Sequence, residues 1–146
     1  MNPGLLDRLK LTGERIAQIA EGLRQIAALP DCIGETMEHF ERPNGLKIDK
    51  VRVPLGVIGI IYEARPNVTA DAFGLCFKTG NAVILKGGSD AIHSNIAIVK
   101  VLQDALEACS MPRTAVQLIE DTDRAVTAQF MKMKEYVCLL YTSDAA

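Results

Sequence analysis

A lysine followed by two glycines and a serine, Lys86, Gly87, Gly88 and Ser89, has the chemistry to hold a phosphate group. Glycines let backbone N–H groups come close to an anion, a following helix N-terminus favours negative charge, and the lysine ammonium can reach phosphate or ribose oxygens. The GxGxxG fingerprint of many dinucleotide sites does not occur in the sequence. These four residues therefore predict a phosphate-binding turn, with a tight turn that merely carries a surface lysine as the alternative.

A second polar turn, Tyr62 to Asn67, has the side chains for carbonyl chemistry. The Asn67 carboxamide can donate a hydrogen bond to an oxyanion that develops on a reacting carbonyl. The Arg65 guanidinium can hold a carboxylate or a phosphate through two parallel hydrogen bonds. The alternative is structural: Asn67 would lie in the first turn of a helix, and Arg65 would pair with Glu63. No role for Glu63 itself follows from the sequence.

Both turns follow apolar runs that predict parallel strands. Residues 53–89 contain an apolar run, a helical segment and a second apolar run, the pattern of a β-α-β unit, which crosses over right-handed and forms a parallel sheet. The first run, Leu55–Ile61, lacks alternation and is therefore predicted to be buried on both faces. Ligands of such sheets bind beyond the carboxyl ends of the strands, so we expect a phosphate-bearing cofactor and a small substrate to meet at these turns.

The chain after the first strand continues to alternate between helices and strands. Ser89 is predicted to cap a long helix whose apolar face would lie on the sheet. Ala115–Glu120 and Tyr136–Leu140 are predicted as third and fourth strands, and Asp121 to Asp123 as the start of the helix between them. In an alternative interpretation, an acidic side chain of this segment, such as Asp121, lies near the adenine ribose of a bound nucleotide. The fold class is therefore α/β, a partial doubly wound, Rossmann-like parallel sheet over residues 55–140.

Two further elements precede this domain. Residues 1–34 contain a helix over 12–29 whose apolar face must dock on another element, since a lone helix could not bury Ile16, Ile19, Leu23 and Ile26. Residues 35–54 predict a protruding, half-exposed β-hairpin, because Pro43-Asn44-Gly45 favours a tight turn between runs of mixed polarity. The hairpin is either a partner-contact element or a cover for the core.

Composition excludes several classes of function. The chain has 146 residues, 49% hydrophobic and 23% charged, with a net charge of −2, so we expect one domain with a real core and binding to neither nucleic acid nor a membrane. No apolar run approaches a membrane span, and the N-terminus does not resemble a signal peptide. The four cysteines form no CxxC and the two histidines no metal motif, so we expect free structural cysteines, no metal and a reducing cytoplasm.

Several segments together resemble the gamma-glutamyl phosphate reductases, a family within the aldehyde dehydrogenase superfamily. The distinctive segments are EARPNVTAD at residues 63–71 and VILKGGS at residues 83–89. The segments ERPNGLKIDKVRVP and VQLIEDTDR agree in the same order, and the resemblance covers residues 4–137. It implies the fold of an aldehyde dehydrogenase-type cofactor domain.

The resemblance also implies an activity and roles for residues. The implied reaction is the NADPH-dependent reduction of L-glutamyl 5-phosphate to L-glutamate 5-semialdehyde in proline biosynthesis, through a cysteine nucleophile. Lys86, with Gly87, Gly88 and Ser89 as neighbours, matches the position that holds the adenine ribose and its phosphate. Asn67 matches the oxyanion donor. The hairpin matches part of a ribbon through which subunits associate, so we expect a homo-oligomer, and a pairing with glutamate 5-kinase.

The chain also departs from this family. Family members are longer on both sides, and no cysteine here matches the nucleophile, so we expect this fragment to be inactive on its own. Residues 141–146 have no counterpart and are expected to lie outside the fold. Two alternatives remain: a cofactor-binding fragment of another aldehyde dehydrogenase, or a non-catalytic nucleotide-binding module.

Overall fold

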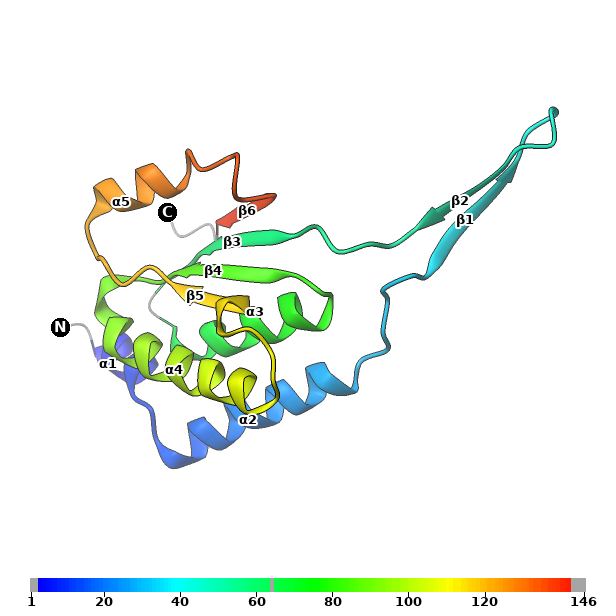
Figure 1. Cartoon of the computed structure of the whole chain (residues 1–146). Coiled ribbons are helices and arrows are strands. Elements are labelled where there is room, and N and C mark those ends of the chain that lie inside the picture. The colour runs from blue at the N-terminus through cyan, green and yellow to red at the C-terminus, as the bar shows by residue number, and fades with distance from the viewer. Residues whose placement is uncertain (1–2, 64, 143–146) are drawn as a thin grey trace.

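The computed structural model describes residues 3–63 and 65–142, which form two separate sheets (Figure 1). A two-stranded antiparallel hairpin consists of β1 (Thr36–Glu41) and β2 (Lys47–Val51). A four-stranded parallel sheet has the order β5-β4-β3-β6. Its strands are β3 (Val57–Ile61), β4 (Ala82–Lys86), β5 (Val116–Leu118) and β6 (Leu139–Thr142).

Helices lie on both faces of the parallel sheet, as the α/β prediction requires (Figure 1). One face carries α3 (Pro66–Lys78) and α4 (Ile92–Ala108), with α2 (Gly13–Ala28) and α1 (Pro3–Leu9) beyond them, and the other carries α5 (Arg124–Phe130). The chain runs outward from β3 through β4 to β5 and then returns to place β6 on the other side of β3. A doubly wound sheet changes direction at such a point, and ligands bind beside it at the carboxyl ends of the strands.

The core lies between β4 and the helices α3 and α4. Val83 and Leu85 of β4 are 1% and 0% exposed, and Val99 and Leu102 of α4 are buried against them. Only Gly59 of β3 is buried, whereas the other residues of that strand are half-buried. The prediction of a strand buried on both faces is therefore wrong for β3, because a single short helix, α5, covers its second face.

Helix α2 docks on α3 at a glycine, Gly74. Thr12 caps α2 by accepting a hydrogen bond from the Arg15 N–H. A Cβ built at Gly74 would lie 2.9 Å from a methyl of Leu23, so the two helices approach closely there. The predicted docking face is confirmed at this contact, but it does not extend to Ile16, which is 54% exposed.

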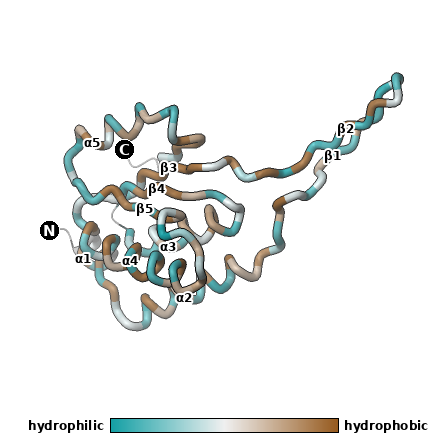
Figure 2. Tube along the Cα trace, in the orientation of Figure 1, coloured by the Kyte–Doolittle hydropathy of each residue, from teal (hydrophilic) through white to brown (hydrophobic). Residues whose placement is uncertain are grey.

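The hairpin projects away from the rest of the molecule (Figures 1 and 2). Every residue of β1 and β2 is exposed, and Gly45 takes the left-handed conformation, with φ of 81°, that the predicted turn requires. Polar and apolar residues mix along it, whereas apolar residues dominate β3 and β4 (Figure 2). The hairpin is more exposed than predicted and does not cover the core, so its Phe40 and Ile48 contact solvent.

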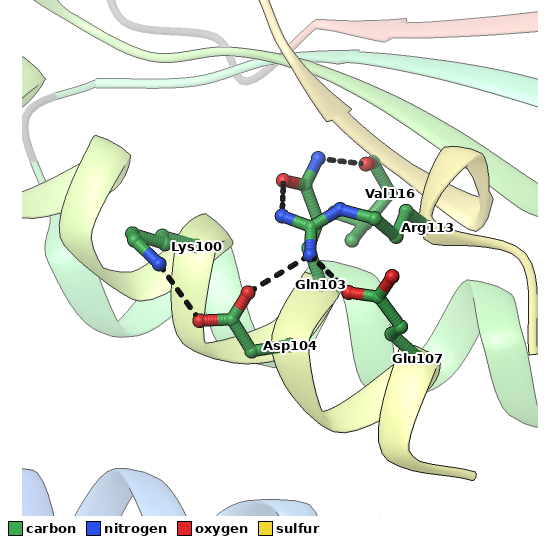
Figure 3. Close-up of polar contacts among 6 residues, drawn as sticks. All are labelled: Lys100, Gln103, Asp104, Glu107, Arg113 and Val116. Atoms are coloured by element: carbon green, nitrogen blue, oxygen red, sulfur yellow. Dashed lines mark hydrogen bonds and ion pairs between the residues drawn. The ribbon is translucent and has the colours of Figure 1, made fainter. Parts of the chain in front are cut away.

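The chain enters β5 from a polar network on α4 (Figure 3). The Arg113 guanidinium donates to Asp104 at 2.9 Å and to Glu107 at 2.7 Å, and Gln103 donates to the Val116 carbonyl at 2.9 Å. The hydrogen bonds from Lys100 and Arg113 lower the pKa of the Asp104 carboxyl. The network fixes the short 3₁₀ turn Arg113–Ala115 and thus the register of β5 against β4.

Several predicted strand boundaries differ from the observed ones. The first strand begins at Val57 rather than at Leu55, and the third spans Val116–Leu118 rather than Ala115–Glu120. The fourth strand begins at Leu139 rather than at Tyr136, because residues 131–138 form turns in which Val137 N–H donates to the Met133 carbonyl. Tyr141 and Thr142 pair with β3, so the expectation that they lie outside the fold is wrong. Residues 143–146, the rest of that segment, lie outside the described residues.

Candidate functional site

The two polar turns predicted as functional follow neighbouring strands at the same edge of the sheet. Ile61 of β3 is paired with Lys86 of β4, and the Tyr62 N–H donates to the Lys86 carbonyl at 3.1 Å. The residues that follow each strand therefore share the carboxyl edge, where ligands of parallel sheets bind. Asn67 lies in the first turn of α3, just beyond this edge.

Lys86 is buried, with 5% of its surface exposed. Its ammonium donates one hydrogen bond, to the Gly87 carbonyl at 3.4 Å, and within residues 3–63 and 65–142 it has no ion pair. A buried ammonium is costly unless an anion or several acceptors compensate it. The surface-lysine alternative is therefore wrong, and the lysine is suited to an anionic ligand.

Gly87 lies in a space that admits no side chain. A Cβ built there would be 2.3 Å from Asn95 Nδ2 and 3.2 Å from the Tyr62 hydroxyl oxygen. Glycine lets the backbone after Lys86 run between these two side chains. Ser89 does not cap α4, contrary to prediction: it begins a 3₁₀ turn, Ser89–Ala91, that has no side-chain cap.

Three buried side chains form a hydrogen-bonded chain beneath this turn. The Tyr62 hydroxyl lies 2.8 Å from Thr69 Oγ1, which donates to Asn95 Oδ1 at 2.9 Å. Thr69 and Asn95 are 0% exposed, and Asn95 Nδ2 has no partner among the described residues. Because Thr69 gives its proton to Asn95, the Tyr62 hydroxyl must donate to Thr69. The chain joins the end of β3 to the first turns of α3 and α4.

Sequence reasoning missed this network, although a signal for it exists. Asn95 lies four residues before Val99 and Thr69 three residues before Ala72, so each polar residue occupies a helix position whose neighbours one turn away are buried. A polar side chain on a buried face must find a partner inside the protein. The partner could not be named without the structure, since the three residues come from three elements.

Burial of Tyr62 predicts a loss of stability at alkaline pH. Desolvation by burial raises the pKa of Tyr62 to about 12. The native state thus favours the neutral phenol. The stabilisation that follows from this difference in pKa is complete below pH about 10 and is lost as the pH rises toward 12. Two pKa units correspond to about 3 kcal/mol. Urea unfolding between pH 8 and about 12 should show this loss, and Tyr62→Phe should flatten it; equal slopes in both proteins would contradict it.

Arg65 and Asn67 adopt the arrangement that the sequence analysis gave as the structural alternative, with Arg65 beside Glu63 and Asn67 in the first turn of a helix. Arg65 Nε lies 3.8 Å from Glu63 Oε2, and Asn67 is exposed in the first turn of α3. Both side chains also line a cleft of about 520 Å³ between this turn and the helices α1 and α2. The ion pair with Glu63 is long, and the Arg65 side chain is more than half exposed. The guanidinium can therefore still reach a ligand in the cleft.

The opposite wall of this cleft comes from the N-terminal segment. It includes Lys10, Arg15 and Gln18, and Asp71 of α3 adds a carboxylate one turn beyond Asn67. Burial raises the pKa of Asp71, and a hydrogen bond from Asn67 lowers it by less. The cleft therefore carries both cationic and anionic groups.

The cysteines lie away from this edge. Cys76 is buried toward the end of α3, and burial raises the pKa of its thiol. Cys109 follows α4, and Cys138 lies before β6 rather than within a strand, against Gly56 at the start of β3. All four thiols are free. Asp121 and Asp123 accept hydrogen bonds from backbone N–H groups at the start of α5, as the capping prediction requires.

Two classes of feature are absent from the described part of the chain. No helix in residues 3–63 and 65–142 is long and apolar enough to cross a membrane. Nor do the same residues bring three or more histidine, cysteine or carboxylate side chains together as metal ligands.

Comparison with known proteins gives this site a context. The chain is 57% identical over 146 residues to gamma-glutamyl phosphate reductase of Anoxybacillus flavithermus, covering 100% of this chain and 35% of that protein. It is 62% identical over 142 residues to the enzyme of the same name from Agathobacter rectalis, covering 97% of this chain and 34% of that protein. The solved gamma-glutamyl phosphate reductase of Thermotoga maritima superposes with a TM-score of 0.94 at 40% identity, over 99% of this chain and 35% of that one.

The chain thus spans about a third of the length of these relatives, and the resemblance to gamma-glutamyl phosphate reductases that the sequence indicates is confirmed. The alignment with the protein of Anoxybacillus flavithermus covers all 146 residues of this chain and therefore includes residues 141–146. Residues 8–145 match the aldehyde dehydrogenase family, and the parallel sheet has the arrangement of that family's cofactor-binding domain. The chain therefore belongs to the aldehyde dehydrogenase family.

Proposed function

We propose that this chain is the cofactor-binding part of an NADPH-dependent reductase that converts L-glutamyl 5-phosphate to L-glutamate 5-semialdehyde in proline biosynthesis. The names of the relatives supply the substrate, since several proteins that are more than half identical to this chain are gamma-glutamyl phosphate reductases. The observation that carries the cofactor half of the proposal is the buried Lys86 ammonium at the carboxyl edge of a parallel sheet, which forms no ion pair within the described part of the chain.

The residues at this edge fit a nucleotide cofactor. Lys86 provides a positive charge that has no counter-ion among the described residues, and Gly87 and Gly88 have no side chains of their own. Together with Ser89 they would hold the adenine ribose and its phosphate through charge-assisted hydrogen bonds. When bound, NADPH supplies the hydride that reduces the acyl group.

The residues at the head of α3 would act on the substrate. Asn67 is exposed and faces the cleft, so its carboxamide can donate to an oxyanion on the reacting carbonyl. Arg65 would hold a phosphate or a carboxylate, because its guanidinium is more than half exposed and only weakly paired. None of the four thiols lies at this edge, so we infer that this chain alone does not turn over substrate.

Lys86→Ala is expected to weaken NADPH binding by about tenfold or more, because a hydrogen bond to a charged group contributes about 1.5–3 kcal/mol. Isothermal titration of the 146-residue chain with NADPH and with NADH measures this, and the wild type should prefer NADPH. Lys100→Ala is the matched control, since Lys100 is exposed and, as far as the described residues extend, bonds only Asp104. Unchanged NADPH affinity in Lys86→Ala would refute the assigned site and favour an unspecialised nucleotide-binding module.

We also propose that the hairpin of β1 and β2 joins this chain to a second copy. Its strands expose Met37, Phe40 and Ile48 along an arm that projects away from the core. A long, exposed strand edge needs pairing or charges to avoid aggregation, and pairing between copies would provide it. We likewise propose that the protein pairs with glutamate 5-kinase and that it is located in the cytoplasm.

A further inference from the structure

Of the two carboxylates among the described residues that line the cleft, Asp71 is the one with no cation beside it. Among the described residues it takes part in no ion pair, whereas the other cleft carboxylate, Asp7, accepts two hydrogen bonds from Arg15 Nη2, at 2.9 and 3.0 Å. Asp71 is half-buried beside α2, and a Cβ at Gly22 would lie 3.3 Å from its Oδ1. The close helix approach thus desolvates the carboxylate and supplies no positive charge to it.

The position of Asp71 relative to Asn67 is that of residues one helical turn apart. Both lie on α3 four residues apart, so their side chains project from the same face of the helix, with Cβ atoms about 5–6 Å apart. Asn67 is the proposed donor to the reacting carbonyl. In a glutamyl group the α-ammonium is separated from that carbonyl by a short aliphatic chain of similar length. A substrate whose carbonyl faces Asn67 can therefore place its ammonium at Asp71.

The remaining charges of the cleft complement the rest of such a molecule. Once Arg15 and Asp7 are paired, the charged groups left among the described residues that line the cleft are Asp71, Lys10 and Arg65. Lys10 has no side-chain partner in the described part of the chain, and Arg65 has only the 3.8 Å contact with Glu63. One negative and two positive groups match a ligand with one ammonium and two anionic groups.

We propose that Asp71 binds the α-ammonium of the glutamyl substrate and so selects an amino acid over a simple dicarboxylic acid derivative. The assignment rests on the proposed function, because it takes Asn67 as the group that faces the reacting carbonyl. A solvated carboxylate that merely accepts a hydrogen bond from the Asn67 amide would not distinguish ligands with an ammonium group from ligands without one. The raised pKa of Asp71, caused first by burial, agrees with a carboxylate that a cationic ligand would relieve.

The test compares two ligands that differ only in the amine. The 146-residue chain is titrated with the γ-methyl ester of L-glutamate and with the monomethyl ester of glutaric acid, and amide chemical shifts are followed by NMR. We expect the amino ester to bind at least about tenfold more tightly and to shift the amides of Gly22, Asn67 and Asp71. Asp71→Asn should abolish this preference, whereas Glu135→Gln, an exposed carboxylate outside the cleft, should retain it.

Three results would overturn the inference: equal affinity of the wild type for both esters, no binding of either ester, or an unchanged preference in Asp71→Asn. The ratio of two affinities in one protein is insensitive to a loss of stability in the variant. NADPH titration of the same samples tests the proposed function separately. A chain that binds NADPH through Lys86 but does not prefer the amine would keep the proposed function and lose the role of Asp71.

Discussion

Gly87→Ala is expected to abolish NADPH binding and to lower the free energy of unfolding by about 1–3 kcal/mol. The new methyl would lie 2.3 Å from Asn95 Nδ2 and 3.2 Å from the ring and hydroxyl of Tyr62. Neither neighbour moves easily, because Asn95 is fully buried on α4 and Tyr62 is hydrogen-bonded to Thr69. The strain can be relieved only by moving the backbone after Lys86, which would displace the ammonium from its position at the sheet edge.

The measurement combines urea unfolding with isothermal titration of NADPH. Gly13→Ala serves as the control, since a Cβ there meets nothing within 4 Å and the residue lies in the first turn of α2. We expect the control to bind NADPH as the wild type does. If Gly87→Ala is as stable as the wild type and binds NADPH equally well, the turn after Lys86 is neither tightly packed nor part of the site.

The parallel sheet was predictable because local signals and global fold agree there. The apolar runs of β3 and β4, the Pro66 at the start of α3 and the left-handed Gly80 at its end each favour the element observed. The turns at residues 62–67 and 86–89 were correctly placed at one edge, because all strands of a β-α-β unit point the same way.

The remaining features depend on contacts between distant residues. The helix positions of Thr69 and Asn95 indicate buried faces, but their hydrogen-bond partners are defined only when α3 and α4 are packed side by side. The start of β6 at Leu139 is set by its pairing with Ile58, and pairing partners are not encoded in hydrophobic pattern alone. The cleft likewise arises where α2 crosses the head of α3, a helix contact that the sequence does not specify.

Thr69→Val is expected to lower the free energy of unfolding by about 2–5 kcal/mol, because it leaves two buried polar groups without partners at about 1–3 kcal/mol each. The Tyr62 hydroxyl loses its acceptor and Asn95 Oδ1 loses its donor, while the shape of the side chain is nearly unchanged. Water cannot replace the hydroxyl readily, since Thr69 and Asn95 are 0% exposed. Such a loss is a large part of the about 5–15 kcal/mol that stabilises an ordinary domain.

A double-mutant cycle separates the network from simple burial of threonine. Once Tyr62→Phe has removed the hydroxyl, Thr69→Val should cost less than in the wild type, because only Asn95 Oδ1 is then left unpaired. Thr69→Ser retains the hydroxyl and should keep most of the stability, and Thr122→Val, at an exposed position, should have little effect. Additive costs of Tyr62→Phe and Thr69→Val would mean that the two side chains do not act as one hydrogen-bonded chain. Coupling between them would show instead that the start of α3, which carries Asn67, is held to the strand end by buried polar contacts.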